Sequence, residues 1–301
     1  MHDIIIVGGG PAGLTAAIYG LRAGKSVLVI EKAGFGGQIA FSPKVENIPG
    51  TQTISGSEFA DKLTEQAMNL GADVELECVS EVIRGEVFTV RTEEGGEYLG
   101  KSVILAVGVK HRTLGLPGEE TLIGNGISFC AVCDGAFYAG QEVAMIGGGN
   151  SALQEALLLS EVCKKVTVVQ NLPPFTDEKR LADALMEKEN VTAIFSTVVV
   201  GYESENGQLT GLQLKNTETG AESRISVDGA FLAVGLVPEN APFAEHAALN
   251  PWGYFDSGED CRTRTEGLFV AGDCRSKTIR QVVTASADGA IAAMAACRYL
   301  D

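Results

Sequence analysis

The stretch HDIIIVGGGPAGLTAAIYGLRAGKSVLVIEK, residues 2–32, has the pattern of a strand, a glycine turn, a helix and a second strand. Gly8, Gly10 and Gly13 follow the first apolar run with the spacing G-x-G-x-x-G. Such glycines allow a tight turn, a close approach of the backbone to a pyrophosphate, and close packing of the helix on the strand. Glu31 ends the second strand, where a carboxylate can accept hydrogen bonds from ribose hydroxyls. The stretch predicts a Rossmann-like dinucleotide-binding unit.

The same pattern returns at residues 141–171, QEVAMIGGGNSALQEALLLSEVCKKVTVVQN. Gly147, Gly149 and Ala152 take the places of the three glycines. In place of the acid at the end of the second strand stands Gln170. Two such units predict an α/β chain of two Rossmann-like, three-layer domains that bind two dinucleotides, the second of them at an atypical site.

Composition narrows the class of protein. The chain has 301 residues, 45% of them hydrophobic, which is enough for two domains with separate cores. Its formal net charge of −16 gives no general attraction to nucleic acid or to an anionic membrane. No basic leader and no apolar run of roughly 18 residues is visible, so we expect neither a signal peptide nor a membrane span. A cytoplasmic location follows, where thiols stay reduced.

Further segments fit an α/β protein that binds two dinucleotides. SVILAVG at 102–108 and GAFLAVG at 229–235 are matching apolar strands, each ending at a glycine. Residues 265–276, TEGLFVAGDCRS, form another strand that brings Asp273 to its carboxyl end, the edge where ligands lie in such sheets. Residues 279–300 are predicted to form an apolar helix that mainly packs in the core.

Cys130 and Cys133 have the spacing C-x-x-C and are followed directly by Asp134. By itself the spacing is compatible with a metal site, a redox disulfide or chance. A metal site needs four ligands, and the other cysteines are scattered without a paired histidine, which disfavours a metal. We expect those five to be packing residues: Cys78, Cys163, Cys261, Cys274 and Cys297.

Five motifs are distributed along nearly the whole chain. They are GGGPAG (8–13), GGQIAFSPKVENIPG (36–50), FCAVCDGAFY (129–138), GGGNSALQEA (147–156) and FVAGDCRSKTIRQVVTASADGAIAA (269–293). In this order and at this spacing they resemble the bacterial-type, low-molecular-weight thioredoxin reductases. The resemblance implies an FAD-dependent disulfide oxidoreductase that is homodimeric and acts on thioredoxin or a related dithiol protein.

The resemblance also implies a domain plan and a set of cofactor contacts. Residues 1–112 and 241–301 would form the FAD-binding domain, and 113–240 an inserted NAD(P)-type domain that carries the cysteine pair. Glu31 would contact the ribose, and Gln38 and Asn47 would line the flavin. Asp273 would contact the ribityl–pyrophosphate region, and Arg280 and Gln281 would contact the isoalloxazine.

Within the pair, the resemblance assigns Cys133 to the sulfur beside the flavin and Cys130 to the sulfur that attacks the partner's disulfide. Asp134 resembles the family's acid/base residue. Ala136 stands where the family usually has an aromatic residue, which leaves Phe137 and Tyr138 as candidate docking aromatics.

The electron donor is where the sequence departs from the family. VVQNLPPFTDEK, residues 168–179, replaces an arginine-rich stretch that would hold the 2′-phosphate of NADP. We therefore expect NADH to be at least as good a donor as NADPH.

Two alternative functions remain open. The first is a reductase that takes electrons from ferredoxin or flavodoxin, which the retained glycine turn and the net charge of −16 disfavour. The second is a flavin-binding redox sensor or NADH oxidase.

Overall fold

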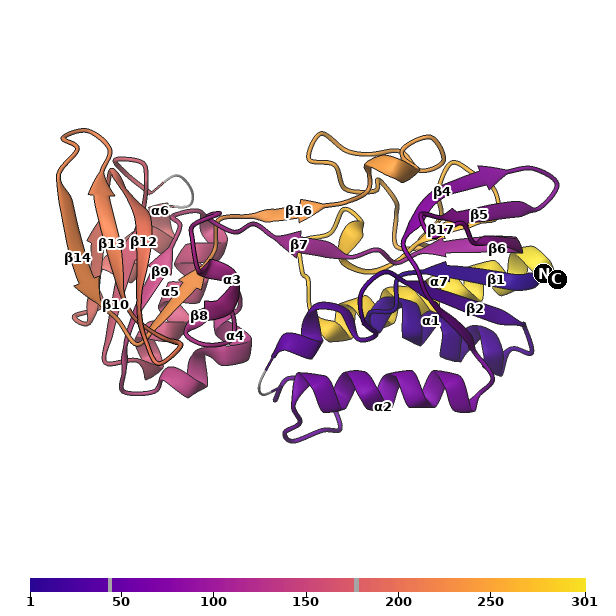
Figure 1. Cartoon of the computed structure of the whole chain (residues 1–301), viewed down its shortest axis with the longest axis horizontal. Coiled ribbons are helices and arrows are strands. Elements are labelled where there is room, and N and C mark those ends of the chain that lie inside the picture. The colour runs from indigo at the N-terminus through magenta and orange to yellow at the C-terminus, as the bar shows by residue number, and fades with distance from the viewer. Residues whose placement is uncertain (43–44, 176–178) are drawn as a thin grey trace. The chain divides into compact units, whose positions relative to one another are not determined.

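The computed structural model describes residues 1–42, 45–175 and 179–301 and divides the chain into two compact units (Figure 1). Unit 1 consists of residues 1–110 and 237–301, and unit 2 of residues 111–236. The divisions lie close to those expected at 112/113 and 240/241. The chain passes between the units through β7 (Val109–His111) and β16 (Leu236–Pro238), which pair with each other.

Unit 1 is built on a seven-stranded sheet in the order β3-β2-β1-β6-β5-β4, with β17 also paired to β6. Strand β6 runs parallel to β1 and β17 at its end and antiparallel to β5 at its start. The strands are β1 (His2–Val7), β2 (Val27–Glu31), β3 (Asp73–Leu76), β4 (Val79–Arg84), β5 (Phe88–Thr92), β6 (Glu97–Leu105) and β17 (Leu268–Val270).

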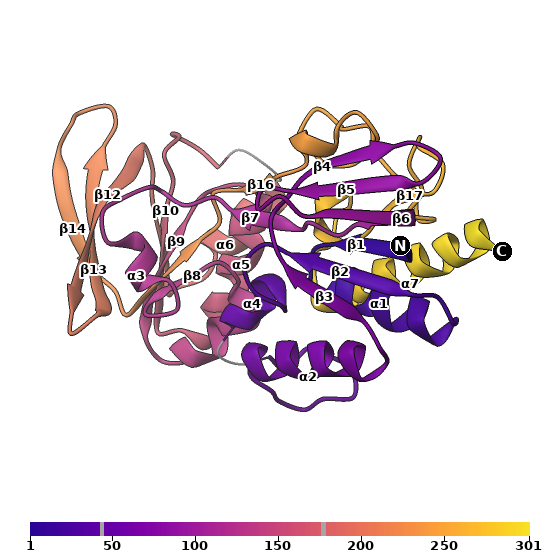
Figure 2. The ribbon, with the colours of Figure 1, turned by 45° about the vertical axis from the view of Figure 1, so that its right-hand side comes forward.

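Helices α1 and α7 pack against each other on one face of this sheet, and α2 packs on α1 (Figures 1 and 2). Strand β1 is buried on both faces, since Ile4 and Ile6 join the core with these helices while Ile5 and Val7 join a second core. This explains its continuous apolar run. The helical segments are α1 (Pro11–Arg22), η1 (Gly37–Phe41), α2 (Gly56–Asn69), η3 (Ala241–Phe243), η4 (Gly272–Cys274) and α7 (Val282–Leu300).

Unit 2 has a five-stranded parallel sheet in the order β11-β10-β9-β15-β8 and an antiparallel sheet in the order β12-β13-β14. Its strands are β8 (Ile127–Ser128), β9 (Glu142–Ile146), β10 (Lys165–Val169), β11 (Val191–Ile194), β12 (Thr197–Glu205), β13 (Gln208–Asn216), β14 (Glu222–Ser226) and β15 (Gly229–Leu232). Its helical segments are α3 (Glu119–Leu122), α4 (Ala131–Asp134), η2 (Gly135–Tyr138), α5 (Asn150–Val162) and α6 (Lys179–Met186).

The two units repeat one arrangement. The order β2-β1-β6 in unit 1 corresponds to β10-β9-β15 in unit 2, with all these neighbours parallel. The first glycine of each turn donates its N–H to the second strand, Gly8 to Ile30 O at 2.8 Å and Gly147 to Val169 O at 2.9 Å. The expected α/β fold with two Rossmann-like units is confirmed. Within the described residues, no helix is both long and apolar enough to cross a bilayer.

Candidate active site

The glycine turn of unit 1 brings the backbone of β1 and α1 unusually close together. Gly8 adopts φ +109°, and a Cβ there would lie 2.3 Å from Ala106 O. A Cβ on Gly13 would lie 1.8 Å from Gly8 O, so helix and strand could not pack at this distance with any side chain. Helix α1 begins at Pro11, with Gly10 as its N-cap. Its N-terminus therefore offers backbone N–H groups to an anion such as a pyrophosphate.

Glu31 lies at the end of β2 beside this turn. Its Oε2 accepts a hydrogen bond from Gly9 N at 2.7 Å, and its Oε1 accepts one from Ala33 N at 3.0 Å. These two bonds hold the carboxylate next to the helix N-terminus, as recognition of a ribose requires.

Asp273 follows β17 in the short helix η4. Burial raises the pKa of its carboxyl to about 6, partly offset by the nearby charges of Lys277 and Arg280. Its Oδ1 is buried and has no hydrogen-bond partner among the described residues. Buried polar atoms are rarely left unpaired, because the lost hydrogen bonds to water are costly. A bound hydroxyl donor would satisfy this oxygen, so the site fits the ribityl chain expected there.

Hydrogen bonds within unit 1 involve three of the other expected flavin residues. Asn47 Nδ2 donates to Gln281 Oε1 at 3.1 Å, and Arg280 Nε donates to Asp273 O at 3.2 Å. The Arg280 guanidinium lies 4.3 Å from the centre of the Tyr254 ring. Gln38 is exposed on η1.

A buried ion cluster that the sequence analysis missed supports η4. Asp288 Oδ2 accepts hydrogen bonds from Gly272 N at 3.0 Å and from Lys277 Nζ at 2.9 Å. Arg275 Nε lies 3.0 Å from the same oxygen as an ion pair, with its N–H not aligned for a hydrogen bond. The signal in the sequence that could have indicated this cluster is Asp288, a single acid in the alanine-rich segment that forms α7. The cluster fixes the backbone immediately before Asp273.

The cysteine pair of unit 2 is a disulfide. Cys130 and Cys133 are bonded with a Cα–Cα distance of 5.3 Å, and both side chains are partly buried. Cys130 is the N-cap of α4, and its Sγ accepts a hydrogen bond from Cys133 N at 3.2 Å. Sulfurs bonded to each other are not available as metal ligands, so this pairing favours the redox interpretation.

Asp134 is connected to the pair through Ser128, another residue that the sequence analysis missed. Ser128 Oγ donates to Asp134 Oδ2 at 2.6 Å and accepts a hydrogen bond from Cys130 N at 3.1 Å. The carboxyl of the last residue of α4 and the hydroxyl of Ser128, which precedes the helix, are thus hydrogen-bonded to each other and can hold a proton close to the cysteine pair in the sequence.

The second glycine turn, in unit 2, closely resembles the first. Gly147 adopts φ +130°, and a Cβ there would lie 2.5 Å from Ala233 O. Gly149 is the N-cap of α5. Ala152, in the place of the third glycine, is fully buried, so this helix and strand leave room for one methyl group.

The model of the family described as pyridine nucleotide-disulphide oxidoreductase matches residues 2–289. The chain belongs to this family. It is 39% identical to the thioredoxin reductase of Bacillus subtilis (strain 168) over 301 residues, which cover all of this chain and 95% of that protein. It is also 40% identical over 306 residues to the bifunctional thioredoxin reductase/thioredoxin of Mycobacterium leprae (strain TN), covering all of this chain and 66% of that protein.

Among solved structures, the thioredoxin reductase from Streptococcus pyogenes MGAS5005 matches with a TM-score of 0.91 and 36% identity, over all of this chain and 98% of that one. The expected enzyme class, a disulfide oxidoreductase of the thioredoxin reductase type that uses FAD and a nicotinamide nucleotide, is confirmed by these similarities.

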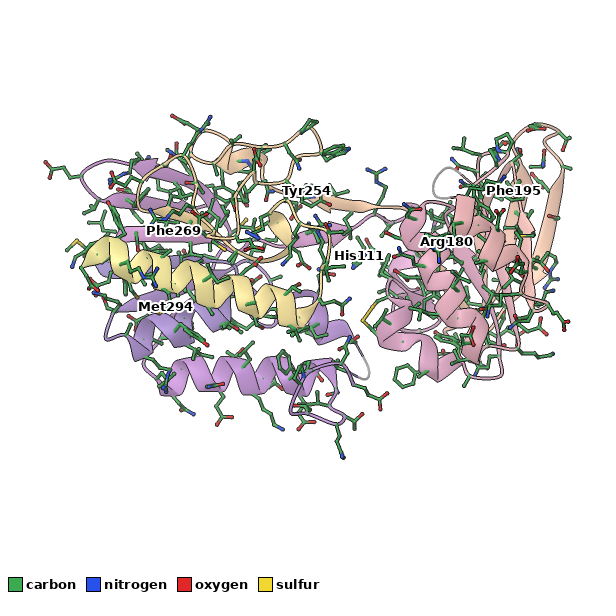
Figure 3. The ribbon with its side chains drawn as sticks, turned by 180° about the vertical axis from the view of Figure 1, so that it is seen from behind. His111, Arg180, Phe195, Tyr254, Phe269 and Met294 are labelled. Atoms are coloured by element: carbon green, nitrogen blue, oxygen red, sulfur yellow. A yellow bond between two sulfur atoms is a disulfide. The ribbon has the colours of Figure 1, made fainter. Side chains whose placement is uncertain are left out.

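Gln170 takes the place in unit 2 that Glu31 has in unit 1. Its side chain is buried, and its Oε1 accepts a hydrogen bond from Asn171 N at 3.0 Å. A Cβ on Gly148 would lie 2.4 Å from Gln170 Nε2, so this amide packs directly on the glycine turn. Asn171 itself is exposed. Of the residues that follow, Thr176–Glu178 lie outside the described part of the chain, and Lys179 and Arg180 are exposed on α6 (Figure 3).

The two candidate docking aromatics differ in exposure. Phe137 is 41% exposed. Tyr138 instead packs edge-on against Phe231, with ring centroids 5.3 Å apart, and burial raises the pKa of its hydroxyl. Val132 and Ala136 are exposed on the same segment. Phe137 is therefore the better candidate for contact with a partner.

Proposed function

We propose that this chain reduces the disulfide of thioredoxin or a related small dithiol protein, using two electrons that pass from a nicotinamide nucleotide through FAD to Cys130–Cys133. The observation that carries the proposal is the disulfide at the start of α4, beside Asp134 and Ser128, in a member of a disulfide oxidoreductase family. Full-length similarity to proteins named thioredoxin reductase supports the partner.

The cofactor contacts are assigned to unit 1. The backbone at Gly8, Gly10 and Gly13 would hold the pyrophosphate of FAD, Glu31 the adenosine ribose and Asp273 the ribityl chain. Bound FAD supplies the exchange of two electrons between a hydride donor and a disulfide. The nicotinamide nucleotide would bind at the second glycine turn, through Gly147, Gly149 and the N-terminus of α5.

The reactive groups are assigned to unit 2. Attack on a partner's disulfide requires a thiolate. We assign this role to Cys130, because Cys133 N already donates a hydrogen bond to its Sγ. Cys133 is the sulfur that would exchange electrons with the cofactor. Asp134 would hold the proton that is taken up or released as thiolates form, with Ser128 orienting its carboxyl.

The assembly and setting are also proposed. An exposed apolar stripe on α7 supports a homodimer of this chain. Five free thiols, Cys78 and four buried ones, support a reducing compartment such as the cytoplasm.

An anaerobic titration tests the electron path. The purified protein is expected to be yellow, to contain about one FAD per chain and to bleach on addition of NADH or NADPH. Bleaching by reduced ferredoxin but by neither nucleotide would contradict the proposed donor and support the ferredoxin-linked alternative. A colourless protein that FAD does not reconstitute would overturn the proposal.

Cysteine variants test the assigned roles. Cys130→Ser should keep flavin reduction by the donor and lose turnover of thioredoxin. Cys133→Ser should also lose turnover and trap a mixed disulfide between Cys130 and the partner, detectable by mass spectrometry. Cys78→Ser, which changes a thiol outside the pair, is the control and should keep its activity. Near-normal turnover in either pair variant would refute the mechanism.

A further inference from the structure

Glu155 of α5 lies against the redox helix α4. Its Oε2 accepts a hydrogen bond at 2.9 Å from the N–H of Ala131, the residue that follows Cys130 and begins α4. Its neighbours on the same helix, Ala152, Ala156 and Leu159, are fully buried and apolar. The side chain is thus a carboxylate on an otherwise apolar face, directed at the backbone between the two cysteines.

The N–H groups at the start of α4 show what this contact does. The first N–H groups of a helix lack partners within it. Cys130 N donates to Ser128 Oγ, Ala131 N donates to Glu155 and Cys133 N donates to Cys130 Sγ. Two of these acceptors are local, whereas Glu155 comes from another helix. The contact with Glu155 therefore fixes α4, and with it the cysteine pair, to α5.

The apolar surroundings of Glu155 strengthen the electrostatic effect of its charge on the cysteine pair. Burial raises the pKa of Glu155, and the hydrogen bond from Ala131 opposes that rise. The strand residues beneath α5, such as Val143, Met145 and Val166, are apolar and buried. The titratable and charged groups on the elements that pack against α5 are Cys130, Cys133, Asp134, Tyr138, Glu142, Lys165, Lys179, Arg180 and Asp183.

We propose that Glu155 is a positioning residue of the redox pair that anchors the first turn of α4 through Ala131 and, by its negative charge, lowers the reduction potential of the disulfide. This inference rests on the proposed function in one respect, that Cys130–Cys133 is redox-active. Its consequence is that the reduced pair is a stronger reductant for the partner protein.

The sign follows from the charges formed in the reaction. Reduction adds two electrons and breaks the Sγ–Sγ bond. The Cys133 sulfur then takes up one proton from Asp134 or from solvent, and the Cys130 sulfur stays as the thiolate that attacks the partner. The disulfide is neutral, whereas the reduced pair carries a negative charge on Cys130. The Glu155 carboxylate accepts a hydrogen bond from the N–H of the next residue, Ala131. Like charges in a poorly solvated site repel each other strongly. Glu155 therefore destabilises the reduced state relative to the oxidised one.

The test compares thiol–disulfide equilibria in the full-length holoenzyme. Wild type and Glu155→Gln are equilibrated with reduced and oxidised dithiothreitol at about pH 8, well above the ordinary pKa of a glutamate carboxyl. Free thiols are alkylated, and peptides that contain Cys130 and Cys133 are quantified by mass spectrometry. Glu155→Gln keeps an acceptor for Ala131 N but removes the charge, so the pair should become about tenfold easier to reduce, equivalent to roughly 30 mV.

Two further variants separate charge from structure. Glu161→Gln removes an exposed carboxylate from the same helix and should leave the equilibrium unchanged within about twofold. Glu155→Asp keeps the charge but draws it back by one methylene, so a shift of about two- to threefold in the same direction is expected. This variant also decides the matter if Glu155→Gln does not fold.

An unchanged thiol–disulfide equilibrium in folded Glu155→Gln would overturn the inference. If only Glu155→Asp folds, an unchanged equilibrium in that variant would do so. An equal shift in Glu161→Gln would also overturn it. These outcomes differ from failure of the proposed function. A wild-type pair that dithiothreitol cannot reduce, or that does not pass electrons to thioredoxin, would count against that function whatever the variants show.

Discussion

Asp273, a residue of the proposed cofactor site, is expected to lower the stability of the folded protein. Burial places its pKa at about 6, above the ordinary value of 3.8, so the folded state holds a proton that the unfolded state releases. The free energy of unfolding should therefore fall as the pH rises from about 4 through 6. At about pH 7 the whole of this destabilisation is present. The same buried position leaves Oδ1 without a hydrogen-bond donor among the described residues, as we expect of a carboxylate that binds the proposed cofactor.

Asp273→Asn tests this trade-off. In the apoprotein the substitution should raise the free energy of unfolding by about 1–2 kcal/mol at pH 7 and by much less at about pH 4, measured by urea denaturation. FAD affinity should fall at least about tenfold, because a hydrogen bond to a charged acceptor is lost. Asp256→Asn, which changes an exposed acid of the same unit, should do neither. Unchanged FAD affinity in Asp273→Asn would remove this residue from the proposed cofactor site.

We expect the preference between NADH and NADPH to depend on single residues as well. A 2′-phosphate needs a cationic partner to be favoured over a hydroxyl, and the strand end offers the buried amide of Gln170 and the exposed Asn171 and Leu172. Wild type should therefore use NADH at least as well as NADPH. Because the Gln170 side chain is buried and packs directly on Gly148, the exposed pair Asn171→Arg with Leu172→Arg is the better test.

That double variant should raise the ratio of kcat/KM for NADPH over NADH by about tenfold or more. Gln208→Arg places the same charge on another exposed part of unit 2 and should leave the ratio unchanged. A wild-type preference of about a hundredfold for NADPH, roughly 2.7 kcal/mol, would show that the interpretation of this strand end is wrong.

At the scale of elements, the two glycine turns form a matched pair with different tolerances. Gly13 cannot accept a methyl group, because its Cβ would lie 1.8 Å from Gly8 O, whereas Ala152 already has one at the equivalent place. Gly13→Ala should separate α1 from β1, destabilise the protein by about 2–3 kcal/mol and weaken FAD binding. Ala152→Gly should cost about 1–2 kcal/mol, because it loses helix propensity and the burial of one methyl group. If urea denaturation gave the same loss in the free energy of unfolding for both variants, the two turns would not differ in their tolerance of a methyl group.

At the scale of the whole molecule, α7 carries the surface on which the proposed homodimer depends. Its buried face is mainly alanine packed on α1 and the sheet. Val283, Ile291 and Met294 on the opposite side are 43%, 41% and 40% exposed, and Met294 is labelled in Figure 3. The spacing of these residues places them along one stripe of the helix. Exposed apolar surface of this kind is typical of an interface between subunits.

Ile291→Glu should convert a dimer into a monomer, because the charge would be buried without a partner at the interface. Light scattering after size-exclusion chromatography measures the change in mass. Val200→Glu makes the same substitution at an exposed position of unit 2 and should remain dimeric. A wild-type chain that is monomeric at micromolar concentration, or an Ile291→Glu variant that stays dimeric, would argue against this surface.

The sequence by itself determined the features that depend on local spacing. Three glycines between an apolar strand and a helix specify the turn at Gly8, since only glycine allows φ +109° with the backbone of Ala106 so near. The same reasoning predicted the second unit, the strand before Asp273 and the packing role of α7. The C-x-x-C spacing placed two sulfurs within one helical turn, but the motifs around it were needed to indicate a redox pair.

Only the tertiary structure decided which distant side chains complete each site. Glu155 meets Ala131 because α5 packs along α4, and Asp288 meets Lys277 because α7 returns beside η4. Gln170 is buried against Gly148 although its amide would suit a surface strand end equally well. Such contacts follow from the packing of whole elements. No periodicity or spacing encodes them, because hydrophobic burial fixes which faces meet without specifying which polar atoms then come within hydrogen-bonding distance.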